Sequence, residues 1–114
     1  WGSHAAKFKT YLGLDIGPSP MTASGKAAIM QYTKHLASRE AEFSITANAL
    51  LPGFFPRKGP VERKDYIKSI NSNIPLKRIG KLGDLISAAD FLISEGSNYM
   101  TGQFIIVDGG YTVW

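Results

Sequence analysis

A single lysine among small residues is the first feature of this sequence that suggests chemistry. Lys26 lies in the stretch 21–28, Met-Thr-Ala-Ser-Gly-Lys-Ala-Ala, which opens a long amphipathic segment that ends near Arg39. We interpret this stretch as the start of a buried helix, because small side chains let a second helix or a cofactor approach the backbone closely. A lysine there would be partly desolvated, which costs free energy unless the charge has a use. A solvated lysine on an ordinary helix is the alternative.

The composition narrows the classes of protein to consider. The 114 residues, 44% of them hydrophobic, suffice for the core of one domain or of part of one. There is no cysteine, so disulfides and thiolate metal sites are excluded, and His4 and His35 are too few and too far apart to indicate a metal. No apolar run reaches the roughly 20 residues that span a bilayer, and the start shows no signal-peptide pattern. We expect a soluble, cytoplasmic protein without a membrane partner.

The positive charge does not indicate a nucleic-acid surface. The formal net charge is +4, yet the basic residues are scattered along the chain. A nucleic-acid surface usually interleaves aromatic side chains with a basic stripe, and that pattern is missing. We interpret the basic residues as a solvated loop and helix, with one loose cluster at Arg57, Lys58, Arg63, Lys64 and Lys68.

Periodicity and turn residues predict an α/β layer with a parallel sheet. The predicted order is a loop over 1–20, a helix over 21–40, a strand over 43–51, helices over 60–72 and 84–94, and a strand over 103–107. The first helix carries two apolar stripes, which predicts two packing partners, and Tyr32 is expected in the core. The third helix has one stripe, at Leu85, Ala88, Ala89 and Leu92.

Three stretches resemble the C-terminal half of the short-chain dehydrogenases/reductases. They are Asn-Ala-Leu-Leu-Pro-Gly at 48–53, Ile-Pro-Leu-Lys-Arg-Ile-Gly at 74–80, and Tyr-Met-Thr-Gly-Gln at 99–103 running into Val-Asp-Gly-Gly at 107–110. The resemblance implies that 21–114 form the C-terminal part of a Rossmann-type three-layer fold with an incomplete parallel sheet, and that the N-terminal coenzyme-binding half is absent. The ending 107–114 and the long loop before the first helix also resemble a branch found in bacterial surface-polysaccharide and flagellin-sugar biosynthesis.

The resemblance assigns Lys26 a catalytic and cofactor-binding role. In the family, a tyrosine four residues before a lysine is the general acid/base, and the ammonium lowers the tyrosine pKa from about 10 and binds the nicotinamide ribose. Four residues before Lys26 the sequence has Thr22, whose aliphatic hydroxyl is a far weaker acid than a phenol. A shifted alignment puts Met21 there, and neither Tyr11 nor Tyr32 fits the motif.

Other positions of the family pattern are matched in part by this sequence. Pro52 and Gly53 match a turn that reaches the nicotinamide carboxamide, and by register the backbone contact would come from Phe55, with Arg57 in place of a frequent threonine. A plain strand terminator is the other interpretation of the Pro-Gly pair. The family's substrate-polarising serine would lie upstream of Trp1, because Ser3 and Ser24 are out of register.

The resemblance leaves several functions open. The Gly-rich phosphate-binding turn of the family does not occur here, so we expect NAD or NADP in the parent protein and none bound by this chain alone. The first hypothesis is an inactive C-terminal fragment of an NAD(P)-dependent oxidoreductase that acts on a sugar-derived substrate. A non-catalytic binding or oligomerisation protein is the second, and a sugar-nucleotide epimerase or dehydratase the third. Two strands make a poor core, which predicts a homo-oligomer or a chain supplying the other half.

Overall fold

The structure, a computed structural model, describes residue 7 and residues 19–56 and 64–113. Its elements follow the predicted order of helix, strand, helix, helix, strand, which confirms the α/β class. Two short 3₁₀ helices, η2 and η3, lie between them. In chain order the elements are α1 (Pro20–Glu40), η2 (Ala41–Phe43), β1 (Ala49–Pro52), α2 (Lys64–Asn73), α3 (Leu82–Ile93), η3 (Glu95–Ser97) and β2 (Phe104–Val107).

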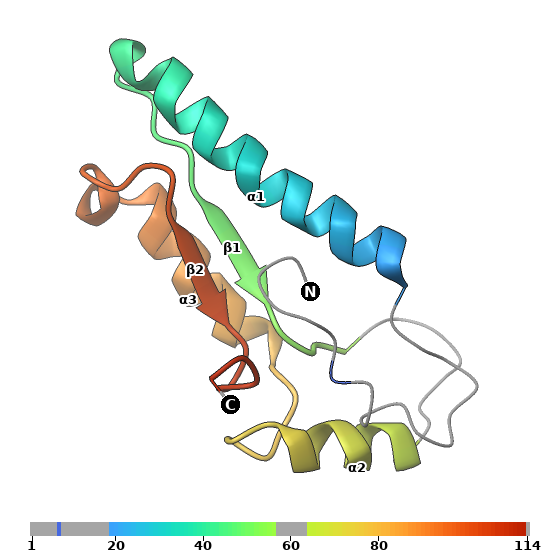
Figure 1. Ribbon diagram of the computed structural model, residues 1–114. Coiled ribbons are helices and arrows are strands. Elements are labelled where there is room, and N and C mark those ends of the chain that lie inside the picture. Colours follow the sequence, from blue (N-terminus) through green and yellow to red (C-terminus); the bar gives the residue numbers. More distant parts are fainter. Residues whose placement is uncertain (1–6, 8–18, 57–63, 114) are drawn as a thin grey trace.

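The two strands form a parallel pair that lies between α1 and α3 (Figure 1). Ala49 pairs with Phe104, and the register continues to Pro52 opposite Val107. A parallel pair requires a long crossover connection, which here contains α2 and α3. Both strands therefore end at the same edge of the sheet, and the segments after Pro52 and Val107 lie next to each other.

The first strand is shorter than predicted. Phe43, expected to begin it, is the last residue of η2, and Ser44 then adopts a left-handed conformation with φ of 60° and donates its N–H to the Ala41 carbonyl. Apolar residue types thus misplaced the start of the strand, because the chain is still turning at Phe43. Pairing begins only at Ala49, whose N–H donates to the Gln103 carbonyl (2.9 Å).

Two of the three motif stretches are hydrogen-bonded to each other just before the strands start. The Asn48 side-chain amide donates to the Met100 carbonyl (2.8 Å) and accepts from the Gln103 N–H (3.0 Å). Gly102, at φ of 71°, donates its N–H to the Ala47 carbonyl (2.7 Å). These bonds fix the register of β1 against β2.

Replacing Asn48 with alanine should therefore weaken the strand pair. The change removes two hydrogen bonds and leaves a backbone donor and an acceptor to find other partners, at a cost of about 1–3 kcal/mol. Urea unfolding followed by circular dichroism measures the loss. Asn98→Ala, at an exposed position near η3, is the matched control. Equal losses in the two variants would contradict the assigned role of Asn48.

The hydrophobic core lies at the carboxyl edge of the sheet. Ile70 of α2, Ile74 and Tyr111 are buried, with Phe54, Tyr66 and Ile79 packed against them. Gly109 and Gly110 have positive φ angles of 65° and 89°, and Cβ atoms there would lie 2.9 Å from Ile74 and 2.8 Å from Pro75. The Leu76 N–H donates to the Gly109 carbonyl (3.2 Å). The stretch 74–80 thus packs on the turn after β2.

The helix α1 is not buried as predicted. Pro20 suits its first turn, because proline lacks the N–H that would have no partner there. Thr33 and Ala37 are its buried residues, whereas Lys26 is exposed and Tyr32, expected in the core, is 57% exposed. The two buried residues lie one turn apart on one narrow face of α1, whereas the large side chains of Met21 and Ile29 are exposed.

The other helices agree better with their patterns. The start of α2 was predicted at Pro60, and residues 60–63 lie outside the described part. It ends at Asn73, because a residue before proline, here Ile74 before Pro75, disfavours the helical conformation. The α3 stripe is half-buried toward the sheet, whereas Ile86, Phe91 and Ile93 are exposed. No helix in the described ranges is long and apolar enough to cross a membrane.

Candidate functional site

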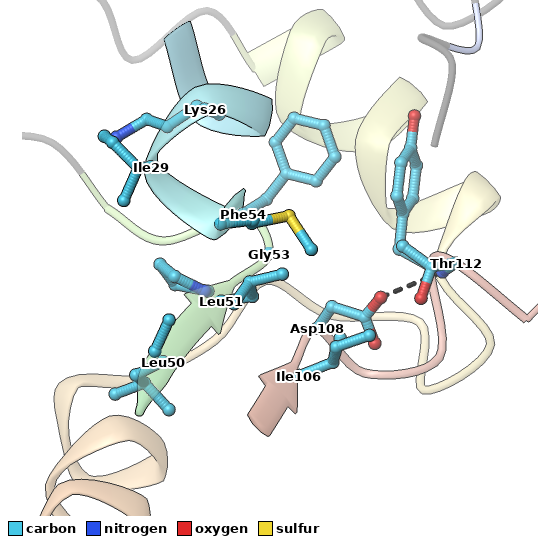
Figure 2. Close-up of a pocket in the computed structure, with 13 residues that line it drawn as sticks. Lys26, Ile29, Leu50, Leu51, Gly53, Phe54, Ile106, Asp108 and Thr112 are labelled. Atoms are coloured by element: carbon cyan, nitrogen blue, oxygen red, sulfur yellow. Dashed lines mark hydrogen bonds between the residues drawn. The ribbon is translucent and has the colours of Figure 1, made fainter. Parts of the chain in front are cut away.

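A cavity of about 200 Å³ lies between α1 and the carboxyl ends of the two strands. Figure 2 shows Lys26 and Ile29 projecting from α1, and Leu50 and Leu51 from β1. In open α/β sheets, ligands bind outside the carboxyl ends of the strands. We call this space the first cavity; the rest of its lining is Met30, Ala49, Pro52, Gly53, Phe54, Ile106, Asp108, Tyr111 and Thr112.

The first cavity contains three of the predicted site residues and leaves out two. Lys26, Pro52 and Gly53 line it together, although they come from a helix and from the strand end. Thr22 is exposed and lines neither cavity described here, although it lies one helical turn before Lys26 on the same side of α1. Phe55 is not among the lining residues of the first cavity, and the backbone contact predicted for it stays a prediction. Ser24, out of register in the family pattern, is exposed on α1.

The Phe55 side chain packs against Gly80 and not toward Lys26. A Cβ atom on Gly80 would lie 2.3 Å from the Phe55 ring, and the Gly80 N–H donates to the Phe54 carbonyl (2.8 Å). Phe54 is the neighbour whose side chain lines the first cavity. Successive side chains in an extended segment point to opposite sides, which explains why the two neighbouring rings lie in different surroundings. Arg57, Ser3 and Tyr11 lie outside the described residues.

Asp108 shapes the turn that forms one wall of the cavity. Its carboxylate accepts the N–H of Gly110 (2.8 Å) and of Thr112 (2.9 Å), the second shown in Figure 2. Gly53 lies directly against it, because a Cβ atom there would be 2.7 Å from the Asp108 Cα. The Asp-Gly-Gly stretch is therefore a structural turn. The sequence did not reveal that this turn brings Asp108, Tyr111 and Thr112 to the cavity that Lys26 also lines.

A second cavity, of about 400 Å³, lies at the start of α3. Phe54 and Asp108 also border it, and the rest of its lining is Phe55, Leu76, Arg78, Gly80, Gly83, Asp84, Ser87, Val107 and Gly109. Arg78 donates two hydrogen bonds to Asp84, from Nη1 to Oδ2 (2.7 Å) and from Nη2 to Oδ1 (3.2 Å). Asp84 also accepts the Lys81 N–H (2.7 Å) and so caps α3.

The Arg78–Asp84 pair predicts acid sensitivity. The Arg78 hydrogen bonds, followed by the Lys81 N–H, lower the pKa of Asp84 from 3.8 to about 2. Because the folded-state pKa lies below the ordinary value, the stabilisation is complete above about pH 4 and is lost as the pH falls toward 2. The pair is exposed, so salt should weaken the effect. Unfolding curves between pH 5 and 2 measure this, and Asp84→Asn and Arg78→Gln should both flatten it. Unchanged pH curves would contradict the prediction.

Lys26 supplies an ammonium group to the first cavity, and most of the other residues that line it are apolar. Lys26 can donate hydrogen bonds to a hydroxyl or carbonyl of a bound ligand, and the walls from Ile29, Leu51 and Phe54 suit a flat apolar ring. Within the described ranges, no group of three or more His, Cys, Asp or Glu residues could hold a metal ion.

Comparison with known proteins shows which family this sequence resembles. The sequence model of the family described as enoyl-(acyl carrier protein) reductase matches residues 14–112. A 3-oxoacyl-[acyl-carrier-protein] reductase of Chlamydia pneumoniae is 41% identical over 85% of this chain and 40% of its own length. Galactitol 2-dehydrogenase (L-tagatose-forming) of Cereibacter sphaeroides is 35% identical over 80% of this chain and 37% of its own.

A solved structure extends the match to three dimensions. The short chain dehydrogenase of Leptospira borgpetersenii, crystallised with bound NAD+, has a TM-score of 0.82 at 33% identity and covers 97% of this chain. The match spans 41% of that protein, so this chain corresponds to about two fifths of the length of its relatives. Its helices and parallel strands match a fragment of that Rossmann-type fold. The chain therefore belongs to the short-chain dehydrogenase/reductase family.

Proposed function

We propose that this chain is the C-terminal part of an NAD(P)-dependent oxidoreductase that transfers hydride between the coenzyme and a carbonyl or alcohol substrate. The observation that carries the proposal is the position of Lys26 in the first cavity, at the carboxyl ends of two parallel strands. The family membership and the NAD+ bound in the Leptospira relative support it. The chain by itself is proposed to be inactive.

The first cavity fits one end of a dinucleotide. Small-molecule sites usually occupy about 300–1,000 Å³, so a space of about 200 Å³ suits a ring-sized group such as nicotinamide and not a whole coenzyme. Lys26 would hold the attached ribose and the apolar walls would hold the ring, which supplies or accepts the hydride when bound. The pyrophosphate needs backbone donors at a helix N-terminus after a Gly-rich turn, and the sequence has no such turn.

In this mechanism the described residues orient the bound coenzyme and exclude water from its ring. Lys26 donates hydrogen bonds through its ammonium group, and Leu51, Phe54 and Ile106 keep water away from the ring. Asp108 holds the turn that forms one wall of the cavity, because its carboxylate accepts two backbone N–H groups. A proton donor must come from elsewhere, since Thr22 is exposed and too weakly acidic.

The substrate class is a sugar-derived carbonyl or alcohol. The galactitol dehydrogenase relative, whose name gives a polyol and a ketose, supports this choice. The narrower resemblance to surface-polysaccharide and flagellin-sugar enzymes has no support from the relatives named above. A 3-oxoacyl thioester, suggested by the Chlamydia relative, is the second substrate to test.

A chimera tests both the reaction and the position of the missing tyrosine. Residues 21–113 would replace the matching segment of the Chlamydia pneumoniae reductase, and coenzyme oxidation would be followed with L-tagatose and a 3-oxoacyl thioester. Thr22→Tyr should raise the rate by about 10²–10⁴-fold, the usual contribution of a general acid/base. A further Lys26→Ala change should remove that gain, and Lys34→Ala, farther along α1, is the control. A chimera that gains nothing from Thr22→Tyr would favour a non-catalytic binding or oligomerisation protein.

The exposed apolar surface supports the proposal that another polypeptide chain binds this one. Among the described residues, four hydrophobic residues are buried, Ala37, Ile70, Ile74 and Tyr111, whereas the large exposed ones include Ile29, Tyr32, Ile86, Phe91 and Ile106. Surfaces of this kind mark protein–protein contacts. We propose that a second copy, or a chain that supplies the N-terminal half, covers them, and sedimentation velocity tests this. A stable monomer with cooperative unfolding would contradict it.

A further inference from the structure

Lys7, which precedes α1, contacts the ring of a residue near the C-terminal end of the chain, Tyr111. Its ammonium nitrogen lies 4.7 Å from the centroid of the Tyr111 ring, and the residue is half-buried. An ammonium group within about 6 Å of a ring face is attracted by the negative charge of the π system, more strongly where water is partly excluded. The contact therefore joins Lys7 to the turn after β2.

Tyr111 connects this contact to the first cavity. It is 3% exposed, and its ring packs edge-on against Phe54 with centroids 5.0 Å apart and an interplanar angle of 82°. Both side chains belong to residues that line the first cavity. The Tyr111 N–H donates to the Asp108 carbonyl (3.3 Å), and the next residue, Thr112, donates to the Asp108 carboxylate (2.9 Å). A displacement of Tyr111 would therefore reach the cavity wall by two routes.

We propose that Lys7 is a positioning residue for the first cavity, because its contact with the Tyr111 ring holds Tyr111 and Phe54 in place as part of the cavity wall. Lys7 acts through Tyr111 and need not touch a ligand. This role does not depend on the proposed oxidoreductase function, since the experiment below uses neither coenzyme nor substrate. A failure of one proposal is therefore distinguishable from a failure of the other.

The contact itself is tested by NMR on the 114-residue chain with ¹³C-labelled lysine. A lysine whose ammonium group lies over a ring has its ε-methylene protons shifted upfield by the ring current. We expect this shift for Lys7 in the wild type, and we expect Tyr111→Leu to abolish it. Tyr111→Phe keeps the ring and should keep the shift, which guards against a folding defect in the leucine variant. A Lys7 signal at the ordinary lysine position in the wild type would overturn the proposal.

The positioning role is tested by hydrogen exchange at the Tyr111 and Thr112 amides. Lys7→Met keeps the length of the side chain without its charge and should speed their exchange roughly 2- to 30-fold, the range that a cation–π contact supports. Lys7→Arg keeps the cation and should restore slow exchange. The matched control is Lys34→Met, because the Lys34 ammonium lies 5.4 Å from the Phe104 ring, and Phe104 lines neither cavity.

The exchange rate of one further amide shows whether Lys7→Met loosens only the cavity wall or the whole fold. The Gln103 N–H, bonded to Asn48 at the other end of the strands, should exchange at the wild-type rate in Lys7→Met. Unchanged exchange at Tyr111 and Thr112 in that variant would overturn the positioning role even if the ring-current shift is present. Equal acceleration at all three amides would also overturn it, because the contact would then stabilise the whole fold and not the cavity wall.

Discussion

Replacing Ile74 with alanine is expected to lower the free energy of unfolding by about 2–5 kcal/mol, the usual cost of such a truncation in a packed core. Ile74 is 1% exposed and packs with Ile70 and Tyr111. Its Cγ2 atom lies so close to Gly109 that a Cβ atom there would be 2.9 Å away. The stretch 74–80 and the turn after β2 therefore both lose packing when the side chain is shortened.

The matched control is Ile93→Ala, which removes the same atoms from a position that is 84% exposed. Its effect should stay within about 0.5 kcal/mol, as is usual for surface substitutions. Urea unfolding of the two variants, followed by circular dichroism, gives both values. Because few of the described residues are buried, the margin of stability is small, and Ile74→Ala should raise the unfolded fraction markedly. Similar losses at the two positions would contradict the assigned core.

Replacing Gly53 with alanine is expected to destabilise the fold by about 1–3 kcal/mol and to distort both cavities. The added Cβ would lie 2.7 Å from both Cα and Cβ of Asp108, so the backbone of the turn after β2 must move. The Gly53 N–H also donates to the Val107 carbonyl (2.9 Å), which holds the two segments together. Asp108 borders both cavities, and its displacement would alter their walls together.

Gly25→Ala is the control for this change, because a Cβ atom on Gly25 would meet no atom within 4 Å. In the middle of α1, alanine should stabilise the helix by about 0.5–1 kcal/mol relative to glycine. The two glycine-to-alanine changes thus have opposite expected signs. Urea titrations give the stabilities, and the amide NMR signals of Gly110 and Thr112 report the turn after β2. Unmoved signals in Gly53→Ala would show that the predicted clash is relieved without moving Asp108.

The sequence predicted the order of the elements well, because periodicity and turn residues are local signals. The helix at Pro20–Glu40 and the strand at Phe104–Val107 agree within a residue with their patterns. The predicted start of the first strand at Phe43 was wrong, since apolar residue types do not reveal the left-handed conformation of Ser44 or the absence of a pairing strand there. The prediction that α1 is buried was wrong for a related reason. An apolar stripe indicates that a helix face packs against another surface, but it does not indicate whether that surface belongs to this chain.

Some features of the candidate site could likewise be predicted from the sequence, and others could not. By itself the sequence determined the three motif stretches, the lysine and the threonine four residues before it, because these depend only on residue identity and spacing. Tertiary structure alone decided that Phe54 and not Phe55 lines the first cavity, and that Asp108, Tyr111 and Lys7 lie near it. The positions of Phe54, Asp108 and Tyr111 follow from the parallel register, which brings the segments after Pro52 and Val107 to one edge of the sheet. Contacts between residues so far apart in the chain leave no periodic signal in the sequence.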